Sequence, residues 1–245
     1  EFGFNGDDQK KLNTGATYMG VRAAKIAQAI RAMVNEVEFD LAGLQSTFSR
    51  AYGTAGSTPF GTANDYTDAS NVLKILKDNG SPVSDNQLVL NTSAGANFIG
   101  KQSAVNSAGT DSMLRQGVLL DLAGMPLRES AQINNHTAGS AANATTNNAG
   151  YAVGATVLTL ASAGTGALLA GDVVTFAGDT NKYVVASGDA NVSGGGTITL
   201  AAPGLRKAIG TSATAITVVG SSARNMAFNR SAIVLAARAP ARPEE

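Results

Sequence analysis

The longest regular pattern of apolar positions in the chain runs from residue 17 to residue 50. No proline interrupts this run, and its alanines favour a helix and allow close packing. We therefore predict one helix over residues 17–50, or two helices nearly in line, with a break no earlier than Gly43. At about 1.5 Å per residue the helix would exceed the diameter of a small domain. The apolar positions follow steps of three, four and seven residues, which is the spacing of one helix face: Met19, Ile26, Ile30, Met33, Val37, Leu41, Leu44 and Phe48.

Residues 51–137 carry shorter patterns of both kinds. A helix capped by Thr67 or Asp68 is expected to have the core face Val72, Leu73, Ile75 and Leu76 and to end at Asn79-Gly80. A short strand over residues 88–90 leads into a helix capped within residues 91–93. A short helix near Met113, a buried strand over 118–122 and a returning strand over 127–133 follow. The order lacks the regular βαβ spacing of a doubly wound sheet, so the pattern predicts an α+β body.

The second half of the chain changes to β character. Residues 137–150 consist almost entirely of Ala, Thr, Asn and Gly, a composition that predicts a linker or an insertion boundary. Five short alternating or β-branched runs separated by glycine-rich turns then predict a small barrel or sandwich: residues 153–160, 172–176, 182–186, 197–200 and 215–219. We expect residues 138–220 to be a compact inserted β unit whose two ends lie close together. The apolar residues between Met226 and Leu235 predict a final buried strand or hairpin.

Composition excludes several classes of function. The chain has 245 residues, of which 44% are hydrophobic and 15% charged, and its 18 basic and 18 acidic residues cancel. This apolar content argues against disorder, and a dedicated nucleic-acid binder should carry a basic surplus. The absence of cysteine excludes a disulfide scaffold, a thiolate metal site and a cysteine nucleophile. No apolar run reaches the roughly 18 residues of a membrane span.

Candidate reactive groups are sparse. His136 is the only histidine, so a Ser-His-Asp triad would have to use it, but its position beside the 137–150 segment favours an ordinary surface histidine. The acidic groups Asp7/Asp8 and Glu36/Glu38/Asp40 suit a solvated or intersubunit role better than a carboxylate dyad. Gly164-Thr165-Gly166 lacks the third glycine and the following helix of a dinucleotide loop. We therefore predict no catalytic, cofactor-binding or metal-binding residues, and we predict that the protein is not an enzyme.

Asparagine and arginine also form recurrent patterns. Four Asn-x-Ser/Thr triplets are expected to be chance matches in Asn-rich and Thr-rich loops: those at Asn91, Asn143, Asn191 and Asn229. Four arginines gather near the C-terminus and could contact phosphate or acidic groups of a neighbouring chain: Arg224, Arg230, Arg238 and Arg242.

Several segments resemble the major capsid proteins of tailed phages, in particular the podovirus-type coat proteins. Residues 223–236 resemble the closing segment of that family, with Asn229 where histidine is commoner. Residues 88–94 are similar to the strand-to-helix junction of the axial domain, and residues 122–130 to the strand turn before a Glu-Ser pair. Residues 171–178, together with 183–185 and 202–205, resemble the β-rich insertion domain of that branch.

The resemblance implies a complete organisation and function. It implies an HK97-like α+β capsid fold with a long spine helix and an inserted, barrel-like all-β domain. Residues 1–16 would be the remnant of an N-terminal arm, 17–137 the peripheral and axial body, 138–220 the insertion, and 221–245 the return strands and tail. Copies of such a protein would form pentamers and hexamers of an icosahedral virion shell, assembled in the bacterial host cytoplasm. Its partners would be itself, scaffolding and portal proteins and, without sequence specificity, the packaged double-stranded DNA; no membrane and no cofactor are implied.

Two other classes of function stay open at this point. The glycine-rich β region and the Asn/Thr-rich loops are compatible with a carbohydrate-binding or adhesin-like surface module. The long helix and an expected absence of exposed aromatics argue against that class, because sugar sites favour Trp and Tyr stacking faces. A serine hydrolase that uses His136 is a formal third alternative, which turnover of an ester substrate would reveal.

Overall fold

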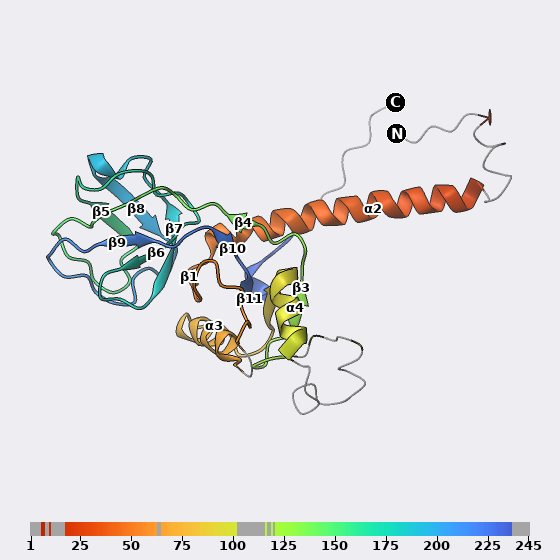
Figure 1. Cartoon of the computed structure of the whole chain (residues 1–245), viewed down its shortest axis with the longest axis horizontal. Helices are drawn as coiled ribbons and strands as arrows, with labels where there is room; N and C mark the ends of the chain where they lie inside the picture. The colour runs from red at the N-terminus through yellow and green to blue at the C-terminus, as the bar shows by residue number, and fades with distance from the viewer. Residues whose placement is uncertain are drawn as a thin grey trace. The chain divides into compact units, whose positions relative to one another are not determined.

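The computed structural model describes residues 6, 7, 10, 18–62, 65–101, 116, 119 and 121–236. The chain divides into two compact units, residues 1–43 and residues 44–245. Helices and strands are mixed along the chain, as Figure 1 shows, so the predicted α+β class is confirmed. The expected short helix near Met113, most of the arm over 1–16 and the tail beyond residue 236 lie outside the described residues, as do parts of the 118–122 run.

Helix α2 (Tyr18–Gly43) is the long helix that the sequence predicts. The α-helix ends at Gly43 and continues as a 3₁₀ turn, η1 (Leu44–Thr47), so the expected break no earlier than Gly43 is confirmed. The last three residues of the predicted range are not helical. Arg50 already belongs to strand β1 (Arg50–Ala51), whose backbone pairs with strand β7 (Lys182–Ser187).

A three-stranded sheet forms the centre of the α+β body. Strand β2 (Asn86–Leu90) lies in the middle, antiparallel to β11 (Met226–Asn229) and parallel to β3 (Leu127–Glu129). The sheet packs with helices α3 (Thr67–Asp78) and α4 (Thr92–Lys101). Their shared core contains buried residues from both helices and from the sheet: Phe60, Ala69, Leu88, Leu90, Ala94, Phe98, Met125 and Leu127.

The ends of these helices follow the predicted chemistry in part. Asn91 caps α4, because its Oδ1 accepts from the backbone N–H of Ala94 at 3.0 Å, and Asn79-Gly80 ends α3 as expected. The predicted cap of α3 is wrong. The residue before the helix is Tyr66, which makes no side-chain cap bond. Asp68 instead accepts from the backbone N–H of Phe60 at 2.9 Å and so ties the preceding loop to the helix.

Residues after 150 form one mainly antiparallel sheet in the order β5-β8-β7-β6-β9, with β1 added to β7 (Figure 1). Each of the five predicted β runs overlaps one of these strands, so that part of the prediction is confirmed. The inward faces share a core that includes Leu158, Val185 and Ile198, all fully buried. Besides β7, the strands are β5 (Val157–Leu160), β6 (Val173–Phe176), β8 (Gly196–Leu200) and β9 (Ile216–Val218).

The low-complexity segment joins the two outer strands of this sheet, so its interpretation as a linker is wrong. The backbone of residues 144–146 bonds to the chain around β9 on one side, with Ile216 N–H donating to the Ala144 carbonyl at 2.8 Å. The other side of the segment bonds next to β5, with Ala161 N–H donating to the Thr145 carbonyl at 2.9 Å. Ala144 and Thr146 are buried. Antiparallel bridges of Thr145 with Ala215 and of Thr146 with Leu160 close the sheet into a ring.

The two segments that connect this β unit to the α+β body lie side by side. Strand β4 (Asn135–His136) leads in, strand β10 (Ser222–Ala223) leads out, and the two pair antiparallel. The expected closeness of the two ends is therefore confirmed, while the boundaries at 138 and 220 stay a prediction. The prediction of a final buried strand or hairpin between Met226 and Leu235 is only half correct. Strand β11 forms, but Asn229 then caps a 3₁₀ turn, η3 (Arg230–Ala232), and Val234 and Leu235 are exposed.

Tyr183 ties β7 to two loops of the β unit. Its hydroxyl donates to Asp179 Oδ2 at 2.6 Å and accepts from the Arg206 N–H at 2.9 Å. Burial, and then the hydrogen bond to Asp179, raise the pKa of Tyr183 to about 12 from 10.0. The folded state therefore holds this proton more tightly than the unfolded chain does.

The Tyr183 pKa predicts a loss of stability at high pH. The contribution is fully present below about pH 10 and declines between about pH 10 and 12, by about 2–3 kcal/mol in total. Urea unfolding across that range should show this decline in the parent and a smaller decline in Tyr183→Phe. The matched control is Tyr52→Phe, because Tyr52 is exposed. A Tyr183→Phe protein with the same decline as the parent would contradict the assignment.

Candidate functional site

The apolar stripe of α2 is the first candidate, because it reaches the surface. Ile30 is 57% exposed and Met33 67% exposed, and Ile26, Val34, Val37 and Phe39 are exposed as well. In proteins most of the stability of a helix comes from the packing of its apolar face and not from intrinsic propensity. The stripe is therefore suited to association. The predicted acidic group of this helix is solvated, since Glu36 and Asp40 are exposed and Glu38 is half-buried.

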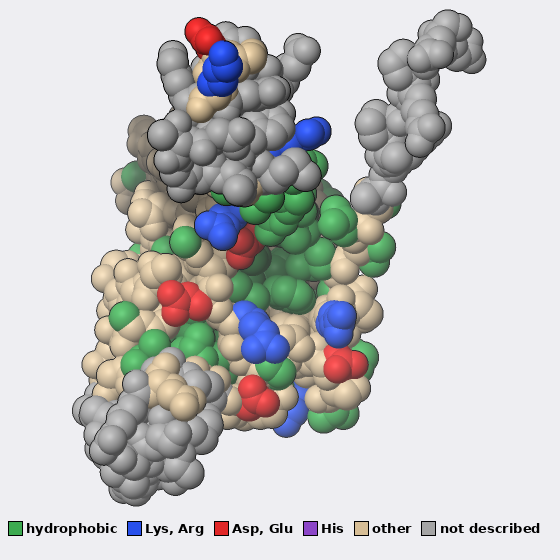
Figure 2. All heavy atoms as spheres, turned by 90° about the vertical axis from the view of Figure 1, so that its right-hand side faces the viewer, with side chains coloured by type: hydrophobic (Ala, Val, Ile, Leu, Met, Phe, Trp, Pro, Cys, Tyr) green, Lys and Arg blue, Asp and Glu red, His purple; other side chains and the backbone are tan. Residues whose placement is uncertain are grey.

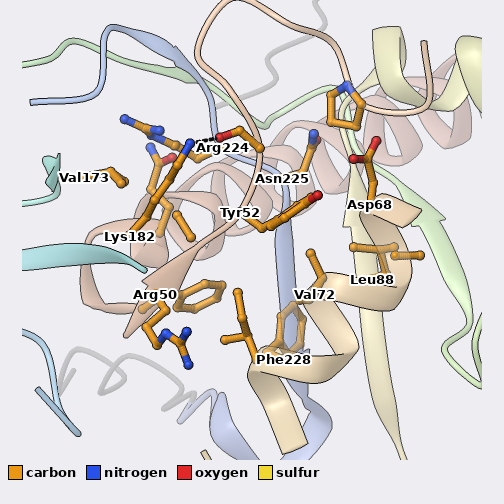
Figure 3. Close-up of a pocket in the computed structure, with 18 of the residues that line it drawn as sticks. Arg50, Tyr52, Asp68, Val72, Leu88, Val173, Lys182, Arg224, Asn225 and Phe228 are labelled. Atoms are coloured by element: carbon orange, nitrogen blue, oxygen red, sulfur yellow. Dashed lines mark hydrogen bonds between the residues drawn. The ribbon is translucent and has the colours of Figure 1, made fainter. Parts of the chain in front are cut away.

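The second candidate is a cavity of about 1060 Å³ within residues 44–245. Strands β1, β2 and β11, helix α3 and the loop of residues 52–62 contribute most of its lining. Figure 3 shows Lys182 and Arg224 on one side of the cavity and Asp68 on the other, with Tyr52 between them in this view. Apolar side chains such as Val72 and Phe228 fill the rest of the wall.

The charged groups of this cavity are held mainly by the fold itself. Arg50, whose side chain is 5% exposed, lies 3.5 Å from Asp78 and donates to Asn181. Lys182 donates to the carbonyl of Gly53, the dashed line in Figure 3. Burial lowers the pKa of Arg224, and the charge of Asp172 opposes that shift. Two guanidinium nitrogens of Arg224 have no hydrogen-bond partner among the described residues. The arrangement brings no nucleophile together with a base.

Among the candidates from the sequence, His136 is the one whose interpretation the structure changes most. Its Nε2 lies 2.8 Å from Oδ1 of Asp172, and its side chain is 13% exposed, whereas that of Asp172 is fully buried. The expectation of an unpartnered surface histidine is therefore wrong. The pairing of β4 with β10 and the bonds between Asp172 and the loop after β4 hold the imidazole at the base of the β unit. The contact with Asp172 gives His136 a structural partner within the β unit.

Asp172 is the residue that the sequence reasoning missed. It accepts from the N–H groups of Gly139 at 3.0 Å and Leu169 at 2.7 Å, besides its contact with His136. The available signal was a single carboxylate next to Gly171 at the start of an almost entirely apolar strand, because a buried carboxylate needs several donors.

His136→Ala is expected to lower the free energy of unfolding by about 1–3 kcal/mol. The substitution removes one partner of a buried carboxylate and leaves its oxygen less well satisfied. Urea unfolding followed by circular dichroism measures the change. Gln28→Ala on the exposed surface of α2 is the control and should be neutral. Unchanged stability of His136→Ala would mean that the contact with Asp172 contributes nothing.

Other sequence candidates also have structural explanations. Gly164 and Gly166 adopt positive φ angles of 85° and 83°. A Cβ at either would lie within 2.5 Å of a carbonyl oxygen of the 140–142 backbone, so these glycines allow close packing and not phosphate binding. The side chains of Asn91, Asn191 and Asn229 each accept a backbone N–H two or three residues later. Arg230 is exposed, and Arg238 and Arg242 lie outside the described residues.

Neither metal binding nor charge adds a further site within the part of the chain that is described. No group of three or more His, Asp or Glu side chains in that part could hold a metal ion. On the face that Figure 2 shows, basic and acidic side chains are interspersed and do not form a continuous field of one sign. No helix among the described residues is long and apolar enough to span a membrane.

No protein-family model matches the sequence, and no curated protein is detectably similar to it. The choice between functions therefore rests on the geometry above and on the motifs of the sequence.

Proposed function

We propose that the protein is a major capsid protein with an HK97-like fold, whose copies assemble into the icosahedral shell of a tailed phage. In this proposal α2 is the spine helix and the β unit between β4 and β10 is the insertion domain. The shell consists of pentamers and hexamers and encloses double-stranded DNA. Scaffolding and portal proteins are its further partners, and the virion is its location.

The exposed apolar stripe of α2 is the observation that carries this proposal. A 26-residue helix that displays Ile26, Ile30 and Met33 on its surface is suited to a protein that is completed by other chains. The resemblance of residues 223–236 and 171–178 to coat-protein segments supports the same assignment. The formal net charge of zero suits a shell that surrounds DNA without binding a specific sequence.

The test is to look for shells directly. The purified full chain is concentrated, with and without a crowding agent, and is followed by sedimentation velocity and negative-stain electron microscopy. Closed particles of uniform diameter are the expected result. A protein that sediments as a monomer at every concentration would overturn the proposal. An amorphous aggregate would count against it as well, because a shell requires repeated identical contacts.

The carbohydrate-binding alternative has little support in the cavity. Four aromatic side chains are among the described residues that line it: Phe60 is buried, Phe48 and Phe228 are half-buried, and only Tyr52 is exposed, whereas sugar sites favour exposed aromatic faces for stacking. A glycan array probed with the full chain separates the two classes. Specific binding of one glycan would favour the surface module, whereas binding to no glycan is the result expected of a shell subunit.

A further inference from the structure

We propose that α2 pairs with the α2 of a second copy, antiparallel, along its exposed apolar stripe. The inference rests on the proposed self-association and deepens it, because it names the surface, the orientation and the register of one contact between copies. Three features of the helix carry it: the spacing of the stripe, the distribution of charge along the helix, and the coincidence of their midpoints.

The spacing of the stripe is that of a two-helix seam. Ile26, Ile30, Met33 and Val37 follow steps of four, three and four residues, which is the heptad spacing of helices that pack along their whole length. All four side chains are exposed. Ala23 continues the same row one step earlier, Asp40 ends it one step later, opposite Ala23 of the other copy in an antiparallel pair centred on the row, and Ala27 and Ala29 flank it. Such small side chains allow two helix backbones to approach closely, so the row can interdigitate with a copy of itself.

The charges of α2 are divided by sign along its length. From its start to residue 31 the only charged residues are Arg22, Lys25 and Arg31. Beyond residue 31 the only ones are Glu36, Glu38 and Asp40. A parallel pair of such helices places like charges near each other, which disfavours that orientation. An antiparallel pair places the basic part of each helix beside the acidic part of the other, so the helix is complementary to its own copy.

The charges and the stripe select the same register. The midpoint between the basic and the acidic group lies near residue 32. The midpoint of the apolar row lies between Ile30 and Met33. An antiparallel pair centred there places Ile26 opposite Val37 and Ile30 opposite Met33 of the other copy. A shift of one heptad in either direction would keep the seam but misalign the charges.

Charge exchange tests the orientation. Glu36→Lys, Glu38→Lys and Asp40→Lys together make the helix wholly basic, and Arg22→Glu, Lys25→Glu and Arg31→Glu together make it wholly acidic. Each triple variant should associate with itself at least about tenfold more weakly than the parent at low salt. An equimolar mixture of the two should restore association. The matched control carries all six changes, which reverses the polarity of the helix and should preserve self-association.

Cysteine pairing tests the register, and the chain offers a clean background because it contains no cysteine. Ile26→Cys and Val37→Cys are prepared separately and oxidised alone and as an equimolar mixture. The proposal predicts a covalent dimer in the mixture and almost none with either variant alone. A dimer formed by each variant alone would indicate parallel helices and would overturn the proposal. Failure of the mixture to cross-link in a protein that self-associates would also overturn it.

These outcomes separate the inference from the function on which it rests. Closed shells without a disulfide between the Ile26→Cys and Val37→Cys variants would overturn the helix pairing and leave the shell assignment standing. That mixed dimer without shells would support the pairing and count against the shell. Circular dichroism of every variant checks that the helix still forms. A monomeric parent whose α2 is protected from hydrogen exchange would mean that the chain covers its own stripe, and would overturn the pairing.

Discussion

Asp172→Ala is expected to lower the free energy of unfolding of residues 44–245 by about 3–5 kcal/mol. The carboxylate is fully buried, and the N–H groups of Gly139 and Leu169 and the ring of His136 all lose their partner together. A loss of this size is a large share of the roughly 5–15 kcal/mol that separates folded from unfolded domains. Urea unfolding monitored by circular dichroism measures it.

Two variants define what the result means. Asp121→Ala removes an exposed carboxylate and should be close to neutral. Asp172→Asn keeps the shape but turns one acceptor into a donor that faces an N–H group, so it should be destabilising as well. Parent-like stability of Asp172→Asn would show that the shape of the side chain matters and its acceptors do not.

Ile30→Asp is expected to abolish self-association while it leaves the unfolding of residues 44–245 unchanged. The sequence pattern alone suggests that a charge here would damage the folded chain, but Ile30 is 57% exposed in the single chain. The cost therefore arises only when another copy covers the stripe and buries the carboxylate, where several kcal/mol correspond to an affinity about 100-fold lower or more.

Sedimentation and electron microscopy measure this effect, and urea unfolding supplies the second readout. Gln28→Asp introduces the same charge on the same helix, at an exposed position outside the stripe, and should associate like the parent. Undiminished assembly of Ile30→Asp would exclude the stripe as an interface. A large loss of stability in Ile30→Asp would instead place the stripe within the core of a single chain.

Local signals predicted most of the elements. The period of the apolar row located α2, and β-branched alternation located the strands from β5 to β9, because each signal is contained in neighbouring residues. The turn at Asn79-Gly80 and the Asn91 cap were predictable for the same reason. The cap of α3 was not, because Asp68 is engaged by a backbone N–H of Phe60 in the preceding loop.

Partners distant in sequence account for the remaining errors. The residues around Ala144 look like a linker because they are small and polar, yet strands more than ten and about seventy residues away supply their hydrogen bonds. His136 looked unpartnered because Asp172 is 36 residues away. The exposure of α2 could not be predicted either. A periodic apolar stripe indicates that a helix face packs against something, but it does not indicate whether the same chain or another one packs there.

The closed ring made by residues 144–146 has a consequence for crowded conditions. An outer strand with free N–H and carbonyl groups can recruit strands from other molecules and lead to fibres or aggregates. Here the hydrogen bonds of Ala144 and Thr145 occupy the outward edges beside β9 and β5. Even where many copies stand side by side, the β unit would offer its neighbours little backbone to extend. Contacts between copies are then left to side chains, which can be both specific and reversible.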